Sequence, residues 1–218
     1  DPRRKRRALT EAELTQLLEI ARRRPLNDAL TVRRGKNKGK LLSKVKPEAR
    51  AKLELLGHER SLIYKTLVLT GLRRNELASL RIANLVLDCS TPHAILDAAN
   101  EKNRKGSQIP LRADLAADIR IWLDKKLDAL RMDSKRLGHP IPARLDPNAM
   151  IFTVPIKLVK ILDRDLIAAG IPKCDQRGRT VDVHAMRHTF GSHLSKGGVP
   201  LRTAQAAMRH STPLLTAN

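Results

Sequence analysis

Apolar residues at helical spacing are the feature that most constrains the fold of this sequence. The longest stripe consists of Leu115, Ile119, Trp122, Leu123, Leu127 and Leu130. Residues three and four positions apart lie on one face of a helix, so this stripe predicts a long amphipathic helix with one buried face. Shorter stripes predict further helices over 10–24, 47–70, 156–169, 184–196 and 201–208. We therefore expect a mainly helical protein.

Local signals set the ends of the first two helices. Thr10 and Glu13 match a capping box, and the helix that follows is expected to end before Pro25. Pro47 starts the second helical region. Gly71 is expected to end it, because glycine readily adopts the left-handed conformation found after many helices.

The middle of the chain contains short strand-like runs. A short helix is expected over 74–80, and strands are expected over 85–87, 94–96 and 107–111. A polar, proline-containing loop is expected over 131–147, after the long helix. The expected fold class is therefore mainly α with a small antiparallel β-sheet (α+β). The 218 residues suffice for one domain with a sizeable core.

Net charge indicates the kind of partner. Lysine and arginine number 43 against 22 aspartate and glutamate, so the net charge is +21. Such an excess favours a polyanionic partner, and nucleic acid is the leading candidate. A membrane surface is disfavoured, because no apolar run is long enough to span a bilayer and no basic helix has an aromatic face. The aromatic residues are too few for a base-stacking platform, which argues against single-strand binding by stacking.

Basic residues also cluster locally. Residues 1–8 are expected to form a basic linker or tail, which either contacts DNA phosphates or is simply solvated. The segment 26–47 is expected to be a basic loop or irregular hairpin that contacts DNA, with Arg33, Arg34 and Lys36 among its cations. Cys89 and Cys174 form neither a disulfide framework nor a zinc pattern. With no signal peptide recognised, a cytoplasmic location is expected.

The stretch 183–191, V-H-A-M-R-H-T-F-G, carries the strongest chemical signal. On a helix, His184, Arg187 and His188 lie on one face, and a histidine beside an arginine there calls for an anionic partner. The two histidines also have the spacing of metal ligands. However, no glutamate lies between them and Arg187 would repel a metal ion, so no metal is expected.

Three further segments supply chemical groups that match those of this stretch. They read T-G-L-R-R-N-E-L over 70–77, E-K-N-R-K-G-S-Q-I-P-L over 101–111 and A-M-R-H-S-T over 207–212. Together the four segments resemble the signature of the tyrosine recombinases, or phage integrases. The resemblance runs from about Leu9 to the last residue. It implies the catalytic-domain fold of that family over residues 9–218.

The resemblance also implies roles for individual residues. Arg73 and Arg187 stabilise the charge on the scissile phosphate, and Glu76 orients Arg73. Lys102 delivers the proton to the leaving 5′-oxygen as general acid. Hydrogen bonds to the phosphate or the attacking oxygen come from His184 and His210. His188 is interpreted as a helix-packing residue. Neighbouring cations are assigned to DNA contact, namely Arg74, Arg104 and Lys105. Arg209 departs from the family pattern, which has glycine at that position.

The implied reaction is site-specific cutting and rejoining of duplex DNA through a 3′-phosphotyrosyl intermediate, without metal or nucleotide cofactor. A homotetramer on DNA in the bacterial cytoplasm or nucleoid is expected, serving a phage or mobile element. No tyrosine follows Tyr64, and the family's nucleophile would fall just after Asn218. The chain as given is therefore expected to be inactive in cleavage. The alternatives are DNA relaxation like that of a type IB topoisomerase, and a basic DNA-binding module without catalysis.

Overall fold

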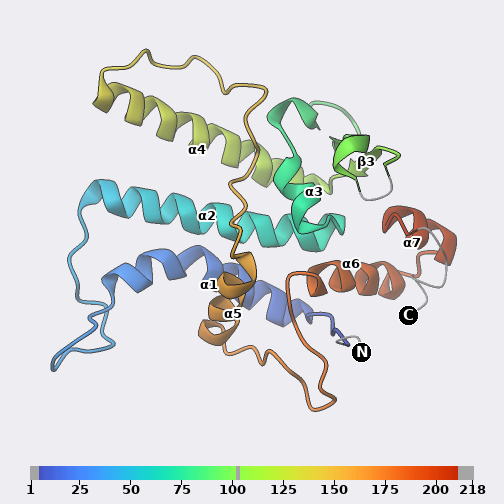
Figure 1. Ribbon diagram of the computed structural model, residues 1–218, viewed down its shortest axis with the longest axis horizontal. Coiled ribbons are helices and arrows are strands. Elements are labelled where there is room, and N and C mark those ends of the chain that lie inside the picture. Colours follow the sequence, from blue (N-terminus) through green and yellow to red (C-terminus); the bar gives the residue numbers. More distant parts are fainter. Residues whose placement is uncertain (1–4, 102–103, 211–218) are drawn as a thin grey trace.

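The computed structural model describes residues 5–101 and 104–210, and Figure 1 shows the arrangement of its elements. In chain order these are α1 (Glu11–Leu30), α2 (Pro47–Thr70), α3 (Arg74–Ser79), η1 (Ile82–Asn84), β1 (Leu85–Val86), β2 (His93–Leu96), η2 (Ala98–Asn100), β3 (Ser107–Pro110), α4 (Ala113–Leu137), α5 (Leu158–Ala168), α6 (Ala185–Lys196) and α7 (Leu201–Ala207). The predicted class, mainly α with a small antiparallel sheet, is confirmed.

Helix α2 lies at the centre of the fold. It contacts α1, α4 and α6, and in Figure 1 it lies between α1 and α4. Its last turns are the most apolar, and Ile63, Leu67 and Val68 are buried there. Near its middle α1 comes unusually close, because a Cβ atom on Gly57 would lie 1.9 Å from the carbonyl oxygen of Arg22. Only glycine therefore allows the two helices to approach this closely.

The prediction that the first helix ends before Pro25 was wrong. Thr10 and Glu13 do form the capping box, but α1 continues through Pro25 to Leu30. Proline removes one backbone hydrogen bond from a helix interior, which is usually destabilising. Here Pro25 is buried, and its neighbour Arg24 bonds Asp165 of α5 at 2.5 Å. Tertiary contacts therefore offset the local cost of the proline.

The expected loop over 131–147 begins later than predicted. Helix α4 continues to Leu137 and ends at Gly138, whose φ of 69° is left-handed. The sequence over 131–137 is polar but contains no helix breaker. Ion pairs along the helix surface, such as Arg136–Asp133 at 3.1 Å, favour its continuation. Polarity alone therefore misplaced the end of this helix.

The three strands form one antiparallel sheet in the order β1-β2-β3. Ala94 of β2 pairs with Leu85 of β1 on one side and with Ile109 of β3 on the other. Ala94, Leu96 and Ile109 are buried against the core. The connection from β2 to β3 contains η2, which contacts α3. This contact brings the sheet to the end of α2 where the candidate site lies.

The N-terminal segment runs beside the loop that precedes α6. The backbones of Lys5 and Arg7 hydrogen-bond to Thr180, and Arg6 bonds Asp182 at 2.9 Å. Asp182 in turn accepts a hydrogen bond from the backbone N–H of Ala185, at the start of α6. The segment therefore supports the start of α6. None of the described helices is long and apolar enough to cross a membrane.

Candidate functional site

The candidate site begins where α2 ends. Gly71 closes that helix with a left-handed φ of 61°, and a Cβ atom there would lie 2.4 Å from the ring of Phe190. Both the conformation and the contact therefore require glycine. The chain then turns into α3, with Arg73 as its N-cap residue.

Arg73 and Glu76 are joined by two hydrogen bonds. The backbone N–H of Arg73 donates to Oε2 of Glu76 at 2.9 Å, and its guanidinium donates to Oε1 at 2.6 Å. The Glu76 side chain is buried, whereas 25% of the Arg73 side chain stays exposed. Burial would raise the pKa of Glu76, but the Arg73 hydrogen bonds and the Arg209 charge outweigh it and lower this pKa. Glu76 is thus an ionised partner that holds Arg73.

Arg187 lies on α6, beneath this turn. Its side chain is buried, and its guanidinium donates to the carbonyl oxygens of Gly71 and Met208. It therefore connects the ends of α2 and α7. Burial, and then the positive charges of Arg73 and Arg209, lower the pKa of Arg187 to about 9, so the group stays charged at neutral pH. An anion bound nearby would relieve this concentration of positive charge.

Two predicted histidines lie beside the arginines. Desolvation lowers the pKa of His210 to about 4, and the charges of Arg187 and Arg73 act in the same direction. Desolvation also lowers the pKa of His184 to about 4, assisted by Arg6 and His188. Both imidazoles are therefore neutral at pH 7, and each has one N–H to donate to an oxyanion.

The interpretation of His188 as a helix-packing residue was wrong. Its side chain is exposed, and its ring lies edge-on to that of His184 with centroids 5.8 Å apart. The inward positions of this helix are taken by Ala185, Met186, Arg187 and Thr189. Within the described residues, no cluster of histidine, cysteine and carboxylate groups is suited to a metal ion.

A surface cleft lies beside these groups. It is lined by Arg73, Arg74, Glu76, Glu101, Arg104 and His184, among others. Arg74 donates to the backbone oxygen of Ile156 at 2.8 Å, so its position is fixed. The structure thus brings together Arg73, Glu76, His184, Arg187 and His210. Lys102 lies outside the described residues, between Glu101 and Arg104.

The remaining predicted DNA contacts lie in two places. Arg104 lines the cleft, and Lys105 next to it is exposed. Arg33, Arg34 and Lys36 are exposed on the loop between α1 and α2. That loop leads into the N-terminal end of α2. The cleft residues Arg73 and Arg74 follow the C-terminal end of α2, which lies on the opposite side of the view in Figure 1. At 1.5 Å per residue, α2 places the loop roughly 35 Å from the cleft.

Two charged residues of the site were missed by sequence reasoning. Arg209 has a left-handed φ of 51° and bonds Oε2 of Glu76 at 2.9 Å. Glu101 is buried and lies 3.5 Å from the guanidinium of Arg209. Both residues lie within the motifs. Arg209 was noted only as a departure from the family's glycine, and Glu101 appeared only as the neighbour of Lys102. Their pairing depends on the fold and has no signal in the sequence.

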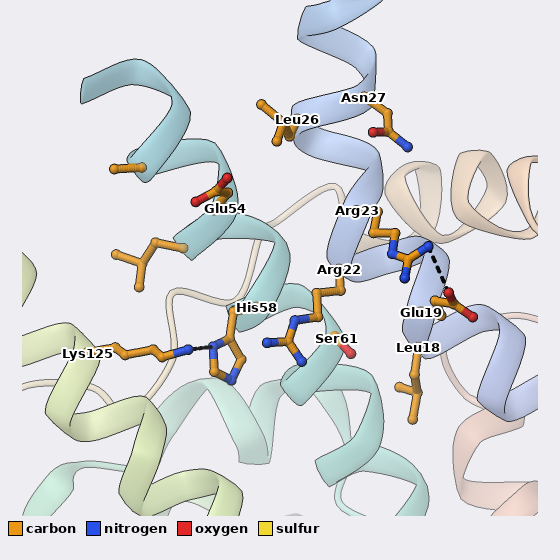
Figure 2. A pocket seen from close by; sticks show the side chains of 12 residues that line it. Leu18, Glu19, Arg22, Arg23, Leu26, Asn27, Glu54, His58, Ser61 and Lys125 are labelled. Carbon is orange, nitrogen blue, oxygen red and sulfur yellow. Dashed lines mark hydrogen bonds and ion pairs between the residues drawn. The ribbon is translucent and has the colours of Figure 1, made fainter. Parts of the chain in front are cut away.

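A second hollow lies between α1, α2 and α4 (Figure 2). Arg22, His58 and Lys125 line it, and the ammonium of Lys125 lies 3.2 Å from Nδ1 of His58. Desolvation, followed by the charges of Lys125 and Arg22, lowers the pKa of His58 to about 4. None of these residues belongs to the four motifs, so this hollow is separate from the candidate site.

The sequence profile of the phage integrase family matches residues 49–218. The chain is 28% identical over 142 residues to the tyrosine recombinase XerD of Caulobacter vibrioides, covering 65% of this chain and 42% of that protein. It is 26% identical over 157 residues to XerC of Corynebacterium glutamicum, covering 70% of this chain and 43% of the relative. The chain thus spans less than half the length of these two recombinases.

Solved structures show the same fold. The XerH site-specific recombinase, bound to its palindromic difH substrate after cleavage, matches with a TM-score of 0.59 and 19% identity, over 100% of this chain and 49% of that one. The Tn1549 transposon integrase, in complex with a circular intermediate DNA, matches with a TM-score of 0.59 and 18% identity, over 100% of this chain and 62% of that one. The catalytic domain of bacteriophage HP1 integrase matches with a TM-score of 0.53 and 17% identity, over 97% and 85%.

Proposed function

Because this chain belongs to the phage integrase family, we propose that it is the catalytic domain of a site-specific recombinase that cuts and rejoins duplex DNA. The observation that carries this proposal is the excess of positive charge at the cleft. Arg73, Arg187 and Arg209 converge on two carboxylates, those of Glu76 and Glu101. Neutral His184 and His210 add N–H donors. A phosphodiester supplies the negative charge and the acceptor oxygens that this arrangement lacks.

The proposed step is an in-line displacement at phosphorus. A tyrosine oxygen attacks, forming a P–O bond to the protein and breaking the P–O5′ bond, and the tyrosine proton passes to a base. Arg73 and Arg187 stabilise the negative charge that develops on the non-bridging oxygens. Lys102 gives a proton to the departing 5′-oxygen. A second 5′-hydroxyl reverses the step, so the bond energy is conserved without a nucleotide cofactor.

The nucleophile cannot be the single tyrosine present in this sequence. Tyr64 is fully buried in α2, and it belongs to none of the four motifs. We therefore propose that the 218-residue chain binds DNA but does not cleave it. Exchange of strands between two duplexes requires four cuts, so we also propose that the active assembly is a homotetramer on DNA.

Binding of duplex DNA tests the partner assignment. Each phosphate contact releases a condensed counterion, so the logarithm of the affinity should fall with the logarithm of salt concentration by about 0.9 per contact. Fluorescence anisotropy with a labelled duplex measures this slope. Arg73→Ala should weaken binding more than Arg164→Ala, which removes an exposed charge from α5 outside the cleft. Affinity that does not change with salt would refute the DNA assignment.

Exchange assays separate the alternatives. With a tyrosine supplied, strand exchange between two sites supports a recombinase, and relaxation of supercoils without exchange supports a type IB topoisomerase. Binding without either reaction supports a DNA-binding module.

The basic loop with Arg33, Arg34 and Lys36 is proposed as a second contact to the duplex, roughly one helical turn of DNA away from the cleft.

A further inference from the structure

Arg209 occupies a backbone position that disfavours any residue with a Cβ atom. Its φ of 51° lies in the left-handed region, where glycine is the usual residue. Arg104 is the other non-glycine residue with positive φ among those described. The recombinases that the sequence resembles have glycine at the position of Arg209. An arginine here accepts unfavourable backbone geometry, which implies that its side chain makes compensating contacts.

The side chain of Arg209 contacts two of the segments that line the cleft, and also the turn that ends α2. Its guanidinium donates to Oε2 of Glu76 at 2.9 Å and to the carbonyl oxygen of Gly71 at 3.3 Å. Its Nε lies 3.5 Å from Oε1 of Glu101, on the connection that leads to β3. Only 8% of the side chain is exposed, so Arg209 is not available as a surface contact for a duplex.

We infer that Arg209 is a positioning residue that fixes Arg73 through the carboxylate they share. Arg73 donates to both oxygens of Glu76, and Arg209 holds the carboxylate from the Oε2 side. With both sides bonded, the Glu76 carboxylate cannot rotate away from the Arg73 guanidinium. The shared carboxylate also neutralises Arg73 only in part, which leaves positive charge facing the cleft. This inference depends on the proposed function only for the identity of the anion that Arg73 binds.

The variant Arg209→Gly separates the side chain from the backbone. Glycine accepts the left-handed conformation without strain, so the turn should form and the protein should fold. Arg209→Lys keeps the charge but loses the planar two-nitrogen donor geometry. It therefore tests whether the geometry of the donors matters in addition to their charge. Arg164→Ala is the control, because it removes one exposed arginine from α5 without touching the site.

The decisive measurement is the Nη1–Hη signal of Arg73 in NMR spectra of the free protein, assigned with Arg73→Lys. The Nη1 group donates to Glu76, so its protons should exchange slowly with water. In Arg209→Gly the exchange should become faster and the signal should shift, with an intermediate result for Arg209→Lys and no change for the control. An Arg73 signal unchanged in both Arg209 variants, with only the melting temperature altered, would show a purely structural role and overturn the inference.

Titration with a short duplex DNA forms the second arm. Arg209→Gly should lose about tenfold in affinity, the effect of about one charge-assisted hydrogen bond, and more than the control loses. Equal losses in Arg209→Gly and the control would contradict the inference. If DNA fails to move the Arg73 signal of the unaltered protein, the proposed function fails instead. The comparison of free proteins needs no ligand, so the two failures are distinguishable.

Discussion

The hydroxyl of Tyr64 donates a 2.7 Å hydrogen bond to Oδ2 of Asp165. Both side chains are completely buried, and the bond joins α2 to α5. Arg24 of α1 bonds the other oxygen of Asp165, and Arg60 lies 3.5 Å from the same atom. Burial, and then the negative charge of Asp165, raise the pKa of Tyr64 far above its usual range. Tyr64 is therefore held as a neutral core residue and cannot be a nucleophile.

The first prediction concerns covalent chemistry. A duplex with a nick beside the scissile phosphate traps the covalent intermediate of a tyrosine recombinase, because the short fragment diffuses away. The 218-residue chain should bind this substrate and give no protein–DNA adduct on a denaturing gel. Tyr64→Phe should bind DNA equally well. An adduct formed by the unaltered chain but not by Tyr64→Phe would sink the assignment of Tyr64 to the core.

The second prediction concerns the buried network around Asp165. Asp165→Ala leaves Arg24 and Arg60 without their shared anion, so the free energy of unfolding should fall by about 3–5 kcal/mol. Asp163 on the same helix offers a matched control, because its partly exposed pair with Lys173 resembles a surface salt bridge. Asp163→Ala should cost about 1 kcal/mol or less. Urea unfolding measures both values, and equal costs would refute the special role of Asp165.

The third prediction concerns the dependence of stability on pH. The pKa of His58 in the folded protein is about 4, below the ordinary value of 6.5. Between these values the unfolded chain binds a proton that the folded protein does not, so stability decreases as pH falls from 6.5 to about 4. His184 and His210 act in the same direction. Urea unfolding measured across this pH range should show that the free energy of unfolding changes less steeply with pH in His58→Gln than in the unaltered protein.

His139 provides the comparison for this experiment, since it is exposed after the end of α4. His139→Gln should reproduce the pH dependence of the unaltered protein. A slope that is the same in His58→Gln and His139→Gln would mean that burial of His58 does not perturb its titration.

The fourth prediction assigns the general acid. In a form of the protein that supplies the nucleophilic tyrosine, Lys102→Ala should cleave ordinary DNA very slowly. In a substrate with sulfur at the 5′-bridging position, the leaving group is a thiolate that needs no proton. Such a substrate should therefore restore cleavage by Lys102→Ala. Arg73→Ala and Arg187→Ala should not be rescued, because they act on the non-bridging oxygens. Rescue of all three variants to the same extent would remove Lys102 from this role.

Much of the fold followed from local pattern, because helix ends and apolar stripes are encoded by neighbouring residues. Gly71 ends α2, and the stripe from Leu115 to Leu130 lies on one helix, as predicted. Pro25 was misjudged because its burial between helices is a property of the whole fold. The partnership of Arg209 with Glu76 joins residues 133 positions apart, and no spacing rule predicts such a pair. Motif resemblance located the arginines, the histidines and Glu76, but it did not indicate that Arg209 shares the Glu76 carboxylate with Arg73.

The link from Arg187 to Gly71 and Met208 has a consequence for the order of folding. Arg187 and Gly71 are 116 residues apart, so their contact closes a long loop, and Met208 is the third member of the link. The antiparallel pair α1–α2 forms through nearby contacts and is expected to appear early, whereas closing long loops is slow. The contact of Arg187 with both segments therefore forms only when the turn after α7 has docked. Until then α2 and Arg73 can be in place while Arg187 lacks one of its two backbone partners. A partly folded chain therefore cannot present the full set of phosphate-binding groups to DNA.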